Sequence, residues 1–202
     1  MTLETVEAYL ASLPGGLDAY PDCMHRGDML ALWLRNSPTD GLAERLPGRL
    51  AAWLGEAKAA TWVPEVHASA LYLAIREAHF ADDGAFLAHA YECNRAVLDT
   101  PGNRLVFWVA TPSAILRGAG LRWSTLHRGT SLDVRIRSDQ AGDLTMAFPA
   151  GLLPEIVLRG NGTGFVAALE NAGARNVEVR LADRQPTQAR FTGRWTMEGR
   201  KG

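Results

Sequence analysis

The chain has 202 residues, of which 47% are hydrophobic and 21% charged, with a net charge of −1. This composition is typical of a globular protein with one substantial core, and it excludes the strongly basic footprint of a nucleic-acid-binding domain. No apolar run is long enough for a membrane span, and the first residues lack the pattern of a signal peptide. We therefore expect a cytoplasmic protein with reduced cysteines at Cys23 and Cys93. A single domain should cover residues 1–198, with a flexible tail at 199–202.

Residues 1–127 have the pattern of a helical layer. In the clearest helix, Pro64 stands in the first turn, and Val66, Ala70 and Leu73 share one face. Gly118 interrupts the pattern of the last helix. The predicted helices are 3–13, 22–35, 39–46, 48–57, 64–79, 82–98, 105–110 and 113–127.

Residues 128–198 have the pattern of a β-β-α-β-β unit. Leu132, Val134 and Ile136 alternate with polar residues, as in a strand with one buried face. Further strands are predicted at 144–148, 177–181 and 189–195, and a helix at 165–172 is followed by Gly173, a residue suited to a left-handed helix end. One-sided strands favour an antiparallel sheet. We therefore predict an α+β fold, in which the helical N-terminal two-thirds packs on one face of a four-stranded antiparallel sheet.

The other face of that sheet is predicted to be exposed and mildly basic. Ordinary solubilising charge explains such a face, since a half-exposed sheet needs polar residues there. The alternative is a surface that binds another protein. The residues concerned are Arg135, Arg137, Arg180, Arg190 and Arg194.

Several short motifs in the sequence resemble segments of a known protein family. The segments LDAYPD at 17–22, GDML at 27–30, WVPE at 62–65, FADD at 80–83 and ALENAGA at 168–174 resemble a myxobacterial paralogous family of uncharacterised proteins of similar length. That family brings no assigned activity. More distantly, helices followed by β-β-α-β-β resemble the ligand-binding fold of vinyl-reductase-type sensors, vesicle-tethering subunits and haem nitric-oxide-binding domains. This resemblance implies sensing or scaffolding rather than catalysis.

A ligand pocket is predicted between the helices and the sheet. Aromatic side chains would line it, although the same residues at these spacings are also typical of a packed core. The candidate lining residues are Trp108, Trp123, Phe148, Phe165 and Trp195.

A glycine run before the last helix offers a second, weaker site. Backbone N–H groups at a helix start bind anions, and Arg159 stands beside Gly160, Gly162, Thr163 and Gly164. The run lacks the third glycine of a dinucleotide fingerprint and the lysine of a phosphate loop. A flexible loop leading into the helix is the alternative to a bound phosphate or carboxylate.

Metal, haem and catalytic sites are not indicated. His89 and Cys93 stand four residues apart on a predicted helix, and Cys23 is close to His25, but neither pair has the repeated spacing of a zinc site. No histidine aligns with a haem-ligating motif, and His67 is interpreted as a hydrogen-bonded core residue. The serines lack the setting of a catalytic nucleophile.

We therefore predict a non-catalytic regulatory module, without a cofactor, that binds a small hydrophobic ligand in an apolar pocket. The alternative is a protein–protein interaction adaptor or homodimerising scaffold that has no ligand. Neither a nucleic-acid partner nor an enzymatic activity is expected.

Overall fold

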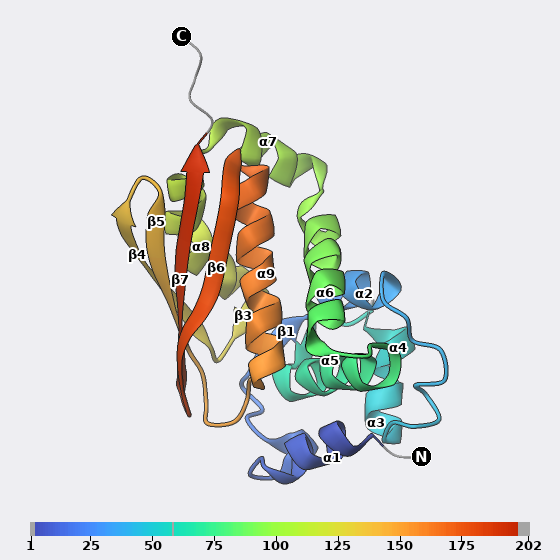
Figure 1. The fold of residues 1–202 in the computed structure, drawn as a ribbon. Coiled ribbons are helices and arrows are strands. Elements are labelled where there is room, and N and C mark those ends of the chain that lie inside the picture. The colour runs from blue at the N-terminus through green and yellow to red at the C-terminus, as the bar shows by residue number, and fades with distance from the viewer. Residues whose placement is uncertain (1–2, 58, 198–202) are drawn as a thin grey trace.

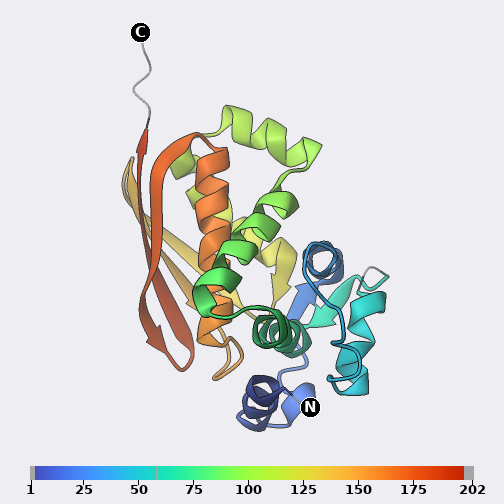
Figure 2. The same cartoon turned by 45° about the vertical axis from the view of Figure 1, so that its right-hand side comes forward.

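The computed structural model describes residues 3–57 and 59–197, and the predicted tail at 199–202 lies outside these ranges. A four-stranded sheet forms one side of the molecule, and helices cover its inner face (Figure 1). The turned view in Figure 2 shows α9 (Glu155–Asn171) between the sheet and α6 (Asp83–Leu98). No helix in the described part of the chain has the length and hydropathy needed to cross a membrane.

The C-terminal sheet confirms the predicted β-β-α-β-β unit. Its strands are β4 (Ser131–Ser138), β5 (Ala141–Ala147), β7 (Gln188–Met197) and β6 (Ala174–Gln185), in that order, and each neighbouring pair is antiparallel. On the covered face Leu144, Met146 and Phe191 are buried, while the arginines of the other face are exposed. The period of two in the sequence therefore separates the inner face from the outer one.

The helices of the first two-thirds mostly follow the predicted ranges. Asp82 caps α6 by accepting a 2.8 Å hydrogen bond from the Ala85 N–H, and Thr111 caps α8 through the Ala114 N–H at 3.3 Å. The helical elements are α1 (Glu4–Ala11), η1 (Gly16–Asp18), α2 (Gly27–Arg35), α3 (Gly48–Ala51), α4 (Trp53–Glu56), α5 (Glu65–His79), α6 (Asp83–Leu98), α7 (Pro101–Val109), α8 (Pro112–Leu126) and α9 (Glu155–Asn171).

A small second sheet corrects two of the predicted helix boundaries. Strand β1 (Met24–Arg26) pairs antiparallel with β2 (Trp62–Pro64) and with β3 (His127–Arg128). Helix α2 therefore begins at Gly27 rather than at residue 22, and α8 ends at Leu126. Strands of two or three residues are too short to show a period of two, so tertiary pairing decides these segments.

The predicted helix at 39–46 is wrong, because this segment forms turns. Its apolar residues still anchor it, since Leu42 and Leu46 are buried in the main core. The glycine at residue 41 has a positive φ of 69°, a backbone conformation outside the helical range. The chain therefore leaves the helical conformation here while keeping its two leucine anchors.

Close packing explains a glycine in α8. A Cβ added at Gly120 would lie 2.6 Å from the Leu132 carbonyl oxygen on β4, closer than real contacts allow. Glycine at this position lets α8 approach the edge of the sheet without breaking the helix. The continuity that Gly118 and Gly120 placed in doubt is therefore maintained.

Candidate functional site: a cavity between α2, α6, α8 and α9

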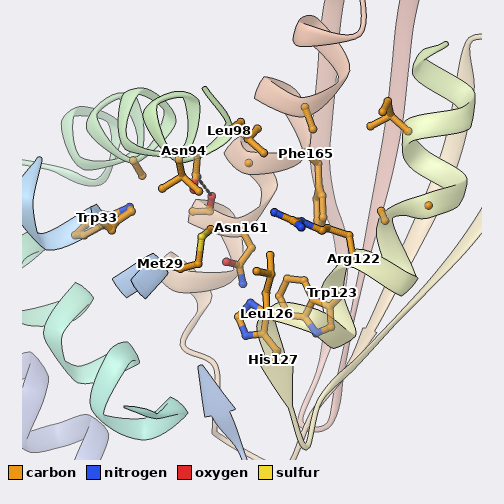
Figure 3. A pocket seen from close by; sticks show the side chains of 18 of the residues that line it. Met29, Trp33, Asn94, Leu98, Arg122, Trp123, Leu126, His127, Asn161 and Phe165 are labelled. Carbon is orange, nitrogen blue, oxygen red and sulfur yellow. Dashed lines mark hydrogen bonds between the residues drawn. The ribbon is translucent and has the colours of Figure 1, made fainter. Parts of the chain in front are cut away.

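A cavity of about 460 Å³ lies among α2, α6, α7, α8 and α9 (Figure 3). This volume is within the range of small-molecule and cofactor sites. Most of the wall is apolar, and no Asp or Glu is among the described residues that line it. The larger apolar lining residues are Met29, Trp33, Phe86, Val97, Leu98, Val106, Phe107, Ile115, Trp123, Leu126, Val157 and Phe165.

Glycines on α9 and an asparagine on α6 shape one wall. Asn94 Nδ2 donates to the Gly160 carbonyl at 3.2 Å and to Thr163 Oγ1 at 3.0 Å, which links the two helices. A Cβ at Gly164 would lie 3.4 Å from the Asn94 side chain, whereas a Cβ at Gly160 would meet nothing within 4 Å. The wall is thus held by hydrogen bonds and leaves space beside Gly160.

Two buried histidines, His25 and His127, form the floor of the cavity, and His127 contacts the buried Glu65. His127 Nδ1 lies 2.9 Å from Glu65 Oε2, and the His127 ring stacks on Trp123 with a centroid distance of 3.8 Å. His25 and His127 are paired across β1 and β3, and their ring centroids lie 4.9 Å apart. Since Glu65 is only 2% exposed, the carboxylate depends on His127 for its hydrogen bond.

The two histidines differ in which ring nitrogens are engaged. His25 Nδ1 lies 2.8 Å from the Arg26 carbonyl, to which it donates, and Nε2 lies 3.3 Å from the Tyr72 hydroxyl. No hydrogen bond from a described residue reaches His127 Nε2, and this atom is not among the buried atoms without a partner. His127 therefore presents one accessible imidazole nitrogen where it lines the cavity.

Burial sets the protonation of this cluster. Burial would raise the pKa of the Glu65 carboxyl, but the neighbouring His127, to which it is hydrogen-bonded, and the nearby His25 outweigh burial, so the Glu65 pKa lies below its ordinary value. Burial also lowers the pKa of His25 and raises that of the Tyr72 hydroxyl. The buried Glu65 carboxyl, which does not itself line the cavity, is therefore ionised at neutral pH.

Two further polar side chains face the cavity. Figure 3 shows Arg122 of α8 extending into it, with Asn161 of α9 between Arg122 and His127. Neither the Arg122 nor the Asn161 side chain forms a hydrogen bond or ion pair with a described residue. These groups, together with His127 Nε2, give an otherwise apolar cavity one polar side.

Two of the five aromatic residues predicted to line a pocket do line the cavity, and the other three do not. Trp123 and Phe165 line the cavity. Phe148 and Trp195 do not line it, because both are buried in the main core. Trp108 does not line it either, since it lies on the outer side of α7 and is 83% exposed.

The predicted glycine loop is wrong. Residues 160–164 lie inside α9, which begins at Glu155, so their backbone N–H groups belong to the helix interior rather than to a free helix start. Thr163 Oγ1 donates to the Gly160 carbonyl at 2.7 Å, and Arg159 lies 3.4 Å from Asp83. Gly162 faces the sheet, where a Cβ would lie 3.5 Å from the Phe191 ring. The helix therefore accounts for Arg159, Gly160, Gly162, Thr163 and Gly164 without an anion.

The arginines of the outer sheet face are exposed, as the alternation predicts. Arg180 and Arg194 both pair with Glu178, and Arg137 lies 3.3 Å from Asp143. No described residue pairs with Arg135 or Arg190. Two carboxylates, Glu178 and Asp143, thus offset part of the positive charge of the five arginines on this face.

The other histidine and cysteine candidates are engaged within the protein. Cys93 Sγ lies 3.3 Å from His89 Nε2, which also lies 2.9 Å from Ser37 Oγ. Trp53 Nε1 donates to His67 Nδ1 at 2.7 Å, so His67 is a hydrogen-bonded core residue. Among the described residues, no group of three or more His, Cys, Asp or Glu side chains could hold a metal ion.

Comparison with known proteins places the fold. No family model and no curated protein matches the sequence, so the resemblance to a myxobacterial family is unsupported. A solved structure from work probing haem distortion in the H-NOX family superposes with a TM-score of 0.55 at 8% identity, covering 88% of this chain and 100% of the other. The chain shares the fold of H-NOX domains.

Two more H-NOX structures agree with this assignment. One, from work on the mechanism of H-NOX activation, has a TM-score of 0.52 at 7% identity and covers 84% of this chain and 96% of its own. The other, a Cs H-NOX mutant with 4-cyano-L-phenylalanine at site 5, has a TM-score of 0.50 at 10% identity. The match covers 86% of this chain and 100% of the mutant chain. At such identities the likeness concerns the fold alone, which agrees with the distant resemblance to haem nitric-oxide-binding domains.

Sequence reasoning missed the residues that give the cavity its polar side. Glu65, Arg122, His127 and Asn161 stand in unrelated segments, and none belongs to a recognisable motif. The pairing of His25 with His127 follows from strands of two and three residues. Arg122 could have been found, because it follows Ile115 and Gly118 on one face of the predicted helix at 113–127.

Proposed function

We propose that this protein is a non-catalytic sensor module that binds a small, largely apolar ligand in the cavity between α2, α6, α8 and α9. The cavity itself carries the proposal, because its volume and apolar wall suit a ligand of drug or cofactor size. Its few polar groups, among them Arg122, Asn161 and His127, would fix the orientation of the ligand. The H-NOX fold supports sensing as the general role, since the related structures come from work on haem distortion in the H-NOX family and on H-NOX activation.

Native mass spectrometry with an absorbance spectrum on freshly purified protein tests this function. We expect a stoichiometric small-molecule adduct that is lost when the cavity is filled by Gly118→Leu. Gly118 lines the cavity, and a Cβ there would meet nothing within 4 Å, so the larger side chain has room to enter it. Gly48→Leu, at an exposed position away from the cavity where a Cβ also meets nothing, is the control. An adduct retained in Gly118→Leu would contradict the assignment to this cavity.

Haem is a second candidate ligand, and one observation favours it. Among the described lining residues, His127 would hold the iron, because its Nε2 is accessible while Glu65 holds Nδ1. Arg122 is placed to meet a propionate. The residues thus fit the group, and a bound haem would supply an iron atom able to take a gas molecule as a further ligand.

Titration with haemin separates haem from other ligands. If haem is the ligand, wild-type protein should develop an intense absorbance band that His127→Gln loses, while circular dichroism shows that the variant remains folded. His25→Gln is the control, because both ring nitrogens of His25 already have partners. Absence of the band in wild type, or its persistence in His127→Gln, would contradict haem ligation by His127.

A further inference from the structure

The charge of the cavity is unbalanced. Among the described residues that line the cavity, Arg122 is the only Lys or Arg, and none is an Asp or Glu. Its guanidinium forms no ion pair with a described residue, unlike that of Arg76, which lies 2.8 Å from Asp83. Arg122 thus brings a positive charge into an apolar chamber that supplies no negative one.

The position of Arg122 on α8 directs its side chain inward. Ile115 and Gly118 stand seven and four residues before it on the same helix face, and both line the cavity. Figure 3 shows the Arg122 side chain extending from α8 into the cavity, which Phe165 and Asn94 also line. Because Arg122 is an exposed residue, water can solvate its charge until a ligand enters.

A ligand that fills the cavity removes this water. A neutral ligand would leave the guanidinium desolvated and unpaired, which is costly, whereas an anionic group would pair with it. The planar fork of arginine suits a carboxylate, and hydrogen bonds to charged groups are the stronger ones. The Asn161 amide and His127 Nε2 lie on the same side and add hydrogen-bonding groups. A single guanidinium in an apolar wall suits a monoanion better than a phosphate dianion.

We propose that the ligand is an amphipathic carboxylate, whose carboxylate pairs with Arg122 while its apolar body lies against α2, α6 and α9. This inference rests on the proposed function, and it specifies the chemical class of the ligand. A fatty acid and the propionate groups of haem are two sources of the same chemistry.

Isothermal titration calorimetry with dodecanoate and dodecan-1-ol tests the charge preference, since the two probes share an apolar chain and differ in the head group. Wild-type protein should bind dodecanoate at least about tenfold more tightly, as expected for a hydrogen-bonded charge pair. Arg122→Met keeps an unbranched apolar stem and should bind both probes equally. Arg117→Met is the matched control, because Arg117 lies on the same helix, is exposed and does not line the cavity.

The outcomes separate this inference from the proposed function. Equal binding of both probes by wild type together with haemin binding that Arg122→Met leaves unchanged, or an equal loss of preference in Arg117→Met, would overturn the role of Arg122 while leaving a cavity ligand in place. Failure of dodecanoate, dodecan-1-ol and haemin all to bind, or binding that Gly118→Leu leaves unchanged, would overturn both proposals. Weaker haemin binding in Arg122→Met, with no preference for dodecanoate in wild type, would identify porphyrin propionates rather than a fatty acid as the source of the carboxylate.

Discussion

The two sides of α9 differ in how they are packed. Toward the sheet, Gly162 lies against Phe191, which is 1% exposed in a continuous core. Toward α6 and α8, Gly160 and Phe165 border a cavity of about 460 Å³. One helix thus separates a close-packed layer from a chamber. The contrast suggests that stability is concentrated on the sheet side and ligand binding on the other.

Phe165 of α9 and Phe191 of β7, which are in contact, provide the largest expected difference. Phe165 and Phe191 meet edge to face with ring centroids 5.7 Å apart, so both substitutions remove the same aromatic contact. Phe191→Ala should lower the free energy of unfolding by about 3–5 kcal/mol, because it leaves a void in the core. Phe165→Ala should cost only about 1–2 kcal/mol, because Phe165 is half-buried beside existing space. Urea unfolding measures both, and equal losses would show that the cavity side is as tightly packed as the sheet side.

The hydrogen bonds of His67 predict a pH dependence within the packed region. Trp53 donates to Nδ1, and Nε2 lies 3.1 Å from the Leu17 carbonyl, so the neutral ring satisfies both partners. Burial is the main reason that the pKa of His67 lies below its ordinary value of 6.5. The unfolded chain therefore binds a proton that the folded protein does not, and stability falls as the pH drops below 6.5 toward the folded pKa. His67 contributes at most about 1.4 kcal/mol per pH unit to the slope of the unfolding free energy against pH.

Trp53→Phe tests that explanation, because it removes the indole donor and retains an aromatic ring. Protonation of Nδ1 would then break no hydrogen bond, so the pKa of His67 should rise and the pH slope of the unfolding free energy should decrease. An NMR titration of the imidazole signals measures the pKa directly. An unchanged His67 pKa in the variant would show that Trp53 does not control its protonation.

Gly160→Ala should raise the free energy of unfolding slightly, whereas the phenylalanine substitutions should lower it. Alanine in a helix interior is more stable than glycine by about 0.5–1 kcal/mol, and the added methyl group meets no atom within 4 Å. Because Gly160 lines the cavity, the same methyl group should weaken the binding of a ligand that fills it. Thermal unfolding and calorimetry measure the two effects, and a loss of stability would show that the position is more crowded than the structure indicates.

The outer face of the sheet should give the smallest effect. Arg135 is exposed on β4 and has no described partner, so Arg135→Ala should change the unfolding free energy by less than about 0.5 kcal/mol. A urea denaturation curve that overlays that of wild type is the expected result. A loss as large as that of Phe165→Ala would mean that this face is packed against something.

The sheet was predictable, as were a pocket and two of its lining residues, Trp123 and Phe165, whereas the polar residues of the cavity were not, for a physical reason. A strand with one buried face alternates in sequence, as Leu132, Val134 and Ile136 do, so local pattern and tertiary structure agree. The start of α9 was missed because the glycines at 160–164 have low helix propensity, and packing on the sheet and α6 overrides it. The floor of the cavity depends on β1 and β3, whose short pairing carries no periodic signal.

Helix α7 has a consequence for how the cavity exchanges with solvent. Val106 and Phe107 face the cavity, while Leu105, Trp108 and Val109 are exposed, and none of the side chains described in this helix is buried. A helix that covers a chamber rather than a core gains little free energy from packing, so its local opening should cost much less than global unfolding. Amide hydrogens of α7 should therefore exchange with deuterium well before those of α9, and a bound ligand should slow that exchange.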